Sequence, residues 1–517
     1  MSIIVERTHI KVTNYDIGDC VKLERQFSVF DQLYHTFFPK GIWYDEEYRT
    51  LYLPRGIDID WLERVLYDTA TYSEEFDPAD TVDPILIKYL PRDDVQKQAL
   101  EFMLGTGDYF YTKNRTQLSV NLNTGVGKTY VSIAMASYLQ TRTIVITSSI
   151  NWINQWKERI IEYTDTKKED IYIISGAATI TRLLNGTHDI NHIKFLLLSH
   201  ATINAYAKKH GWNAVSELFK FFKVGLKIYD ESHLYFDNTL MVDFYSNTKK
   251  TVYLTATPAR SDKDENRVYQ LAFKNVPKID LFNEETDPHT KYIAIHYNSR
   301  PNPQQISSCR NAYGFDILKY IDYVSWKSNF YELIYVLLDM VLPLDGKILI
   351  YIGKNDVINI IYNWMTYNFP QLAGNIGIYN STIPKTDKPA MLEKKVILST
   401  TKSCGAAMDI KDLKCTIVLA EPFGSLVTTR QTLGRTRDRD TYYIDIIDNG
   451  FDTLVRYFNK KKSTFNKYAE ECKNIYLSDR ELHEKCNNIK WKMNNAYNDY
   501  LKSLNQEQGK KVIFRRK

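Results

Sequence analysis

The sequence lacks the features of membrane, secreted disulfide-bonded and zinc proteins. No apolar run among its 517 residues is long enough to span a bilayer, and the N-terminus does not have the plan of a signal peptide. Its 6 cysteines show no Cys-x-x-Cys spacing. We therefore expect reduced thiols in a cytoplasmic compartment (the host cytoplasm if the chain is viral), with no membrane partner and no structural zinc.

A large excess of charge of one sign is also absent. The formal net charge of +5 permits nucleic-acid binding but does not indicate it, because basic patches can be local. Hydrophobic residues make up 44% of the chain and charged residues 25%, which is typical of a folded globular protein. The length indicates about three or four domains.

The apolar segments predict four regions. Residues 1–90 contain alternating segments and an amphipathic stretch at 60–67, which predict a β-rich domain with one helix. Short apolar runs alternate with helical segments over 91–285 and again over 286–450, and 451–517 is largely helical and charged. Apolar strands separated by helices indicate a parallel sheet covered on both faces, so the predicted fold class is α/β with two such lobes. The expected strands are 117–122, 143–147, 171–174, 195–198, 226–229 and 252–254 in the first lobe, and 292–296, 348–352, 396–399, 416–419 and 442–447 in the second.

A glycine loop at residues 123–129 (Asn-Thr-Gly-Val-Gly-Lys-Thr) joins an apolar strand to an amphipathic helix. This arrangement places backbone N–H groups and a positive helix end around a polyanion. Lys128 would contact the β- and γ-phosphates of a nucleotide, and the Thr129 hydroxyl would hold Mg²⁺. The leading glycine of the usual signature is replaced by Leu122, so the loop needs partners elsewhere to identify an ATP site. The phosphate cradle would be formed by Thr124, Gly125, Val126 and Gly127.

Two downstream strand ends supply such partners. Asp230 and Glu231 follow the apolar run 226–229, where a phosphate-loop ATPase needs an Asp for Mg²⁺ and a group that orients the attacking water. Thr255 and Thr257 follow the next apolar run. An acidic pair alone would usually be a solvated turn, but here it must be explained together with the glycine loop and the hydroxyl residues.

These segments resemble motifs I, II and III of superfamily 2 helicases, and residues 431–435 (Gln-Thr-Leu-Gly-Arg) resemble their motif VI. The resemblance covers roughly residues 91–450. Within the superfamily, the layout is most similar to the UvsW-like DNA helicases of tailed bacteriophages and to related large-DNA-virus helicases. The resemblance implies two tandem RecA-like lobes, a small N-terminal β-rich domain for substrate recognition and a helical C-terminal extension.

The resemblance also assigns roles in the second lobe. Arg435 would be the arginine finger that reaches the γ-phosphate when ATP closes the cleft, and Gln431 would line that cleft. The second arginine of the motif falls at Asp438, which leaves Arg437 as the favoured second finger. Asp409 would hydrogen-bond the ribose or a water of the cleft.

Upstream of the loop, Arg92 and Gln96 resemble the adenine-recognition segment of the family. Gln96 would bind the adenine edge and Arg92 would stack on the ring. Their spacing is one residue longer than in the commonest relatives, so a solvent-facing helix start is the competing interpretation.

Contacts with nucleic acid are implied at strand ends that match motifs Ia, Ib, IV and V. Hydroxyls, backbone N–H groups and lysines there can bind phosphates without reading sequence, although Ser and Thr also cap helices. His233, Thr255 and Thr257 would couple the ATP site to these contacts. The candidate contacts are Ser148, Ser149, Ser199, His200, Gly353, Lys354, Thr400 and Thr401.

The sequence therefore predicts an enzyme that uses ATP and Mg²⁺ to translocate on or unwind nucleic acid. By resemblance the substrate is branched or duplex DNA, in recombination and replication-fork repair. The alternatives are an RNA helicase or transcript-release ATPase, and an ATP-gated nucleic-acid binding module without strand separation. The motor residues do not distinguish these three functions.

Overall fold

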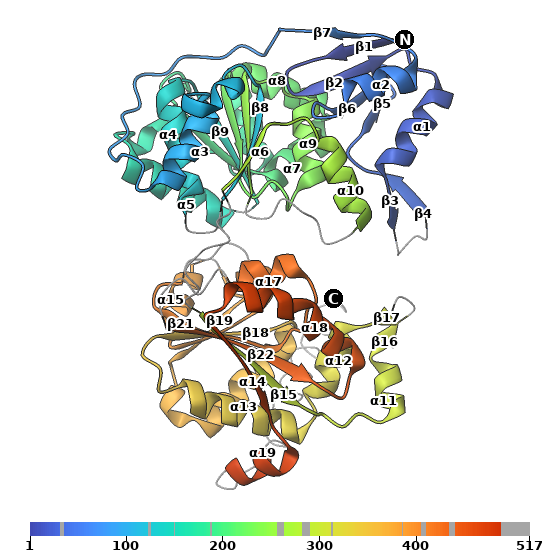
Figure 1. Ribbon diagram of the computed structural model, residues 1–517. Coiled ribbons are helices and arrows are strands. Elements are labelled where there is room, and N and C mark those ends of the chain that lie inside the picture. Colours follow the sequence, from blue (N-terminus) through green and yellow to red (C-terminus); the bar gives the residue numbers. More distant parts are fainter. Residues whose placement is uncertain are drawn as a thin grey trace, which may run out of the picture. The chain divides into compact units, whose positions relative to one another are not determined.

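The computed structural model divides into two compact units, Met1–Asn283 and Glu284–Lys517 (Figure 1). It describes residues 1–31, 36–122, 126–148, 150–186, 189–255, 263–281, 290–311, 314–384, 386–404, 410–433 and 440–486. Within these ranges, no helix combines the length and the apolar character needed to cross a bilayer.

The first unit is built on a seven-stranded, entirely parallel sheet in the order β10-β11-β9-β12-β13-β8-β14. This sheet confirms the first predicted α/β lobe. All six expected strands are present, and the edge strand β14 is additional. The strands are β8 (Gln117–Asn121), β9 (Thr143–Thr147), β10 (Ile171–Ile173), β11 (Phe195–Ser199), β12 (Leu226–Tyr229), β13 (Lys250–Thr255) and β14 (Lys278–Asp280).

Helices cover both faces of this sheet, as continuous apolar strands require. The strands bury side chains in two cores, one beneath α3 to α5 and the other beneath α6 to α10. The helices of the first face are α3 (Asp94–Leu104), α4 (Lys128–Leu139) and α5 (Ile150–Tyr163). Those of the second face are α6 (Ala177–Leu184), α7 (His200–His210), α8 (Asn213–Phe222), α9 (Phe236–Phe244) and α10 (Lys263–Ala272). Two short 3₁₀ helices, η1 (Gly107–Thr112) and η2 (Lys168–Asp170), connect these elements.

The N-terminal residues form a separate five-stranded mixed sheet in the order β5-β6-β2-β1-β7. The predicted helix is α2 (Ile59–Leu66), and a second helix, α1 (Ile17–Phe27), was not predicted. Gly18 and other weak helix formers hide α1 in the sequence. The strands are β1 (Ser2–Val5), β2 (His9–Thr13), β5 (Trp43–Asp45), β6 (Thr50–Pro54) and β7 (Ala70–Tyr72).

This N-terminal sheet shares one apolar core with the second face of the lobe. Leu51 and Leu53 of β6 are fully buried in the same cluster as Phe236 and Leu240 of α9. Hydrogen bonds cross the same boundary, including one from Trp43 Nε1 to the Tyr245 hydroxyl (2.9 Å). The N-terminal sheet and the first lobe therefore form one packed body.

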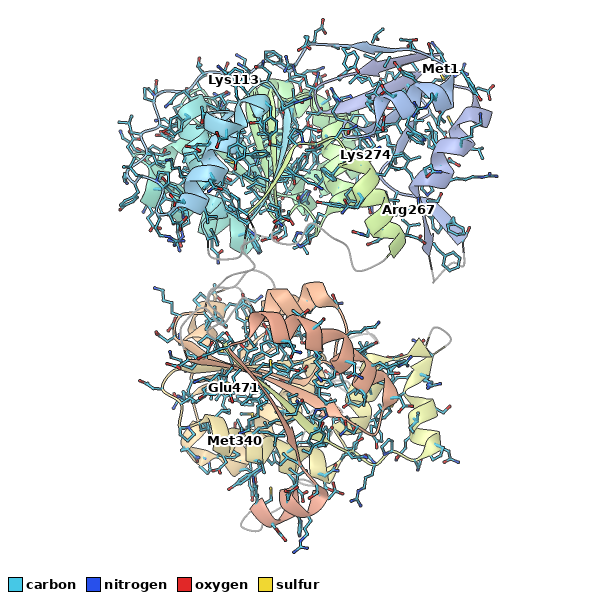
Figure 2. The ribbon with its side chains drawn as sticks, in the orientation of Figure 1. Met1, Lys113, Arg267, Lys274, Met340 and Glu471 are labelled. Atoms are coloured by element: carbon cyan, nitrogen blue, oxygen red, sulfur yellow. The ribbon has the colours of Figure 1, made fainter. Side chains whose placement is uncertain are left out.

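A small hairpin, β3 (Ser28–Asp31) and β4 (Thr36–Pro39), lies beside α10. An isolated two-stranded hairpin is marginally stable, so its anchoring matters. Arg267 of α10 donates to the Ser28 carbonyl (2.6 Å), and Lys274, which follows the end of α10, donates to Asp58 (2.7 Å). Figure 2 labels both Arg267 and Lys274. Phe37 of the hairpin is 62% exposed.

A buried ion pair lies where the N-terminal sheet meets the lobe. Lys227 Nζ contacts Asp243 Oδ1 at 2.6 Å, and both side chains are at most 1% exposed. The Asp243 carboxylate also accepts hydrogen bonds from the hydroxyls of Tyr229 (2.8 Å) and Tyr253 (2.5 Å). Thr8 donates to the backbone carbonyl of Asp243 (3.0 Å), which ties the N-terminal sheet to the same point.

The second unit contains another seven-stranded parallel sheet, in the order β19-β20-β18-β21-β22-β15-β23. It confirms the second predicted lobe, with all five expected strands and two more at the edges. The strand β23 lies within the C-terminal region that the sequence pattern describes as largely helical. The strands are β15 (Thr290–Tyr297), β18 (Lys347–Ile352), β19 (Ile376–Tyr379), β20 (Val396–Ser399), β21 (Leu413–Ala420), β22 (Thr441–Asp448) and β23 (Glu471–Tyr476).

Helices again cover both faces of this second sheet. One core lies beneath α12, α13, α14 and α19, and the other lies beneath α16 and α18. The helices of this unit are α11 (Pro303–Ser308), α12 (Ile317–Val324), α13 (Ser328–Val341), α14 (Asn355–Asn368), α15 (Lys388–Leu392), α16 (Thr401–Cys404), α17 (Leu426–Leu433), α18 (Asp452–Tyr468) and α19 (Asp479–Lys485). The remaining elements are the short strands β16 (Arg310–Asn311) and β17 (Gly314–Phe315) and the 3₁₀ helix η3 (Pro370–Leu372).

Candidate nucleotide site

Gly127 is the N-cap residue of α4, and its φ of +109° is in the left-handed region. A Cβ atom at this position would lie 2.4 Å from Gln96 Nε2. Glycine is therefore favoured by the backbone conformation, and a side chain at this position would displace the Gln96 amide. The first turn of α4 presents Lys128 and Thr129 at the carboxyl edge of the sheet, where β8 ends.

Lys128 is paired with the acidic segment that follows β12. Its Nζ donates to Glu231 Oε1 at 2.6 Å, and the two side chains are 10% and 9% exposed. Glu231 has a φ of +51°, a left-handed conformation that is uncommon for a residue with a side chain. Strained backbone of this kind clusters at functional sites. The structure thus brings the predicted phosphate-binding lysine and the predicted water-orienting glutamate together.

Asp230 lies deeper than its neighbour and is 4% exposed. Its Oδ2 accepts a hydrogen bond from Trp156 Nε1 of α5 at 2.8 Å. Burial, reinforced by the negative charge of Glu231, raises the pKa of Asp230 to about 7, while Lys128 and the Trp156 hydrogen bond act in the opposite direction. A buried carboxylate with a raised pKa in such a position is typical of a functional site.

Glu231 is linked to the end of β13 through His233. His233 Nδ1 lies 3.4 Å from Glu231 Oε2 and 2.9 Å from the Thr255 hydroxyl. All three side chains are buried. Two of the three residues predicted to couple the ATP site to nucleic acid, His233 and Thr255, therefore form a continuous chain of contacts from the acidic pair to the next strand.

The segment of Arg92 and Gln96 has features of both interpretations given above, a helix start and a nucleotide-recognition segment. Asp93 caps α3 by accepting from the Gln96 backbone N–H (2.9 Å), so a helix does begin there. Gln96 nevertheless points into the site, where its Nε2 donates to the Val126 carbonyl at 2.7 Å. Arg92 is held on the surface by Asp93, with Nε to Oδ2 at 2.9 Å.

The oxygen atoms at the site suit a hard divalent cation. Thr129 and Asp230 would hold Mg²⁺ together with nucleotide phosphates and water, a donor set made only of oxygen. Among the described residues no group of three or more His, Cys, Asp or Glu side chains could hold a metal without such help. When bound, the ion would neutralise phosphate charge.

The candidate nucleic-acid contacts differ in the hydrogen bonds that they make within the protein. Ser148 follows β9 at the same carboxyl edge. Ser199 caps α7 by accepting from the Thr202 backbone N–H at 3.3 Å, which is the alternative that the sequence left open. Thr400 accepts from the Ser403 backbone N–H (3.1 Å) in the same way in the second unit.

Three further candidates in the second unit have intramolecular partners. Both the backbone N–H (2.7 Å) and the hydroxyl (2.5 Å) of Thr401 donate to Glu421. Lys354 is paired with Asp322. Gly353 lies against Glu421 and Ile321, where an added Cβ would come within 2.8 Å of Ile321.

His200 is a packing residue. Its ring is 1% exposed and is stacked between Tyr229 (5.9 Å) and Tyr235 (5.1 Å), so it is out of reach of a backbone phosphate. We therefore leave it out of the proposed contacts. Some remaining candidates fall on parts of the chain that are not described. Gln431 lies in α17, with its side chain outside the description, and Thr124, Gly125, Ser149, Thr257, Asp409, Arg435 and Arg437 lie outside the described residues.

The buried imidazole of His200 should make stability depend on pH. Burial lowers its pKa from 6.5 to about 3. Below pH 6.5 the unfolded chain binds a proton that the folded chain does not, so the free energy of unfolding should fall as the pH falls, by about 1.4 kcal/mol per pH unit. His200→Phe keeps a stacked ring and should flatten this dependence, as measured by urea unfolding at a series of pH values. Parallel curves for the two proteins would contradict the assignment.

Two residues of these sites were not assigned a role from sequence. Trp156 belongs to the segment that resembles motif Ia, but nothing in a single sequence indicates that its indole reaches Asp230. Glu421 follows the apolar run of β21 directly, which is the same pattern that identified Asp230 after β12. An acid at the carboxyl end of a buried parallel strand is therefore the signal that could have found it.

Comparisons with known proteins agree with this fold. The family described as "Type III restriction enzyme, res subunit" matches residues 90–260, which contain the glycine loop and the acidic pair. The protein named "Putative helicase 161L" of Invertebrate iridescent virus 6 is 21% identical over 373 residues, covering 68% of this chain and 77% of that protein.

Solved structures share the fold of two parallel-sheet lobes. Mss116p bound to ssRNA and AMP-PNP is 13% identical, covers 79% of each chain and has a TM-score of 0.52. S. cerevisiae Dbp5 bound to RNA and ADP BeF3 is 14% identical, covers 76% of this chain and 91% of its own, and has a TM-score of 0.50. T4 UvsW covers 93% of this chain and 100% of its own at 12% identity, but its TM-score of 0.36 is too low to support an argument.

The motifs in their expected order, the restriction-subunit match and the viral relative show that the chain resembles superfamily 2 helicases, which are ATP-hydrolysing enzymes, and the solved structures agree with a fold of two parallel-sheet lobes.

Proposed function

We propose that the chain is an ATP-driven DNA translocase or helicase that acts on branched or duplex DNA in recombination and replication-fork repair. The observation that carries the motor part of this proposal is the contact between Lys128 and the acidic pair. Lys128, Asp230 and Glu231 come from two separate segments and meet at one edge of the sheet, within 2.6 Å in the case of Lys128 and Glu231.

The residues of this site suit phosphoryl transfer. Lys128 would leave Glu231 for the β- and γ-phosphates, because a phosphate carries more negative charge than a carboxylate. Glu231, released from Lys128, would orient the attacking water. Asp230 and Thr129 would hold Mg²⁺, and backbone N–H groups at the start of α4 would bind phosphate oxygens.

The link through His233 and Thr255 supports an ATPase whose hydrolysis responds to bound nucleic acid. Glu231 contacts His233, and His233 contacts Thr255 at the end of β13. A conformational change at the end of β13 would therefore alter the position of Glu231, the residue that would orient the water. Arg435 of motif VI, with Arg437 as the favoured second arginine, would add positive charge at the γ-phosphate.

The choice of DNA rests on the resemblance of the motif layout to UvsW-like helicases. The Mss116p and Dbp5 structures contain RNA, which is a property of those proteins. An RNA helicase is therefore the second candidate, and an ATP-gated binding module is the third. The N-terminal sheet and its aromatic hairpin would recognise the substrate, because exposed rings such as Phe37 offer stacking surfaces to bases.

ATP hydrolysis measured with different nucleic acids tests the proposal. We expect forked or duplex DNA to stimulate phosphate release more than RNA of the same length, at a fixed salt concentration because binding depends on salt. A fluorescent strand-displacement assay on the same substrates would then separate the functions. Stimulation by RNA alone would overturn the DNA assignment, and stimulation without displacement would identify a translocase or a binding module.

A further inference from the structure

The hydrogen bond between Trp156 and Asp230 joins the proposed magnesium ligand to a helix that carries none of the catalytic residues. The indole Nε1 donates to Asp230 Oδ2 at 2.8 Å. Trp156 is 2% exposed and Asp230 is 4% exposed, so water does not compete freely for either group. A hydrogen bond from a neutral donor to a buried carboxylate is strong and directional.

The helix that supplies this indole starts close to Ser148, a candidate nucleic-acid contact. α5 (Ile150–Tyr163) begins two residues after Ser148, which itself follows the carboxyl end of β9. β9 is paired with β12, and the Asp230 backbone N–H donates to the Ile146 carbonyl of β9 at 3.0 Å. α5 and Asp230 therefore follow the ends of two adjacent strands, β9 and β12.

The position of Trp156 within α5 makes it sensitive to movement of that helix. Its ring packs in the core beneath α3, α4 and α5, together with Ile153 and Ile160 of the same helix. Any displacement of α5 relative to the sheet would move the indole relative to Asp230. Because a hydrogen bond weakens steeply with distance and angle, such a shift would change the orientation of the Asp230 carboxylate.

We propose that Trp156 is a positioning residue that orients Asp230 for Mg²⁺, and that α5 transmits nucleic-acid binding near Ser148 to the ATP site through this indole. The proposal rests on the proposed function. Partners that hydrogen-bond to ligating carboxylates typically change metal affinity or activity by about 10–100-fold, so the indole is expected to have a measurable effect.

Trp156→Phe tests the proposal because it keeps an aromatic ring, although a smaller one, and removes the N–H donor. The Mg²⁺ concentration for half-maximal ATP hydrolysis should rise about 10-fold, while the rate at saturating Mg²⁺ should recover most of its wild-type value. The ratio of hydrolysis rates with and without nucleic acid should fall. A residue with only a packing role would leave the Mg²⁺ dependence unchanged.

Trp152→Phe is the matched control, since Trp152 lies one turn earlier in α5 and is only partly buried. This variant should keep the wild-type Mg²⁺ dependence and stimulation ratio. Tryptophan fluorescence gives a second readout. Mg²⁺ with a non-hydrolysable ATP analogue should change the emission of the wild type and of Trp152→Phe, and the change should be lost in Trp156→Phe.

If Trp156→Phe fails to fold, the fluorescence experiment is repeated with Asp230→Asn, which should also lose the emission change. A Trp156→Phe protein with wild-type Mg²⁺ dependence and stimulation, or an Asp230→Asn protein with the full emission change, would overturn the proposal. Failure of the proposed function is distinguishable, because the wild-type protein would then hydrolyse no ATP with any nucleic acid.

Discussion

Replacing Lys128 by Ala should abolish nucleic-acid-stimulated ATP hydrolysis, reducing the turnover rate by roughly 10²–10³-fold or more. Lys128 lies at the start of α4, and its charged side chain reaches the acidic pair, with Nζ 2.6 Å from Glu231 Oε1. Without it, the charge that develops on the phosphates in the transition state loses its partner. Phosphate release at saturating ATP, Mg²⁺ and nucleic acid measures the effect.

Lys97→Ala is the matched control for this experiment. Lys97 is an exposed lysine of α3, the helix that also carries Gln96, and it makes none of the contacts of the site. Its removal changes the net charge by the same amount but should leave turnover near the wild-type rate. Near-normal turnover in Lys128→Ala would show that the nucleotide site lies elsewhere.

Replacing Asp243 by Ala should destabilise the first unit by about 3–5 kcal/mol, because Lys227 would be left as an uncompensated buried charge. Lys227 is 0% exposed and has Asp243 as its ionic partner at 2.6 Å. The Tyr229 and Tyr253 hydroxyls would lose their acceptor in the same substitution. Urea unfolding followed by a signal from the first unit gives the free energy.

Two comparisons make this second prediction specific. Asp237→Ala removes an acid from the same helix, α9, but Asp237 is 49% exposed beside Lys40, so the loss should stay within about 1 kcal/mol. The double variant Lys227→Met, Asp243→Asn removes both charges and keeps an acceptor for a tyrosine hydroxyl. It should be more stable than Asp243→Ala. Equal losses for Asp243→Ala and Asp237→Ala would contradict the role assigned to the pair.

The strands that line both cores could be predicted from the sequence, because continuous apolar runs such as 143–147 leave few other structures. Three of the four edge strands could not. β23 (Glu471–Tyr476) has mostly exposed side chains, β19 contains Gly377, and β14 has three residues. Pairing with a neighbouring strand, rather than burial of their own side chains, defines β23 and β14.

The acidic pair and Lys128 could be predicted because their chemistry requires those residue types at strand ends. Orientation could not be predicted in the same way. His200 has the side chain of a polar contact but lies between two tyrosines, and Trp156 has the side chain of a core residue but donates to Asp230. Which way a side chain points depends on the packing of helices against the sheet, and a single sequence does not contain that information.

The shared core between the N-terminal sheet and the first lobe limits how the chain can be dissected. A protein that starts at residue 91 would lose Leu51 and Leu53, and it would expose Phe236 and Leu240 to water. It would also lose the hydrogen bond from the Thr8 hydroxyl to Asp243. Such a truncated protein would tend to aggregate, so its inactivity would say nothing about substrate recognition. Point substitutions on the exposed surface of the N-terminal sheet are the informative route to its role.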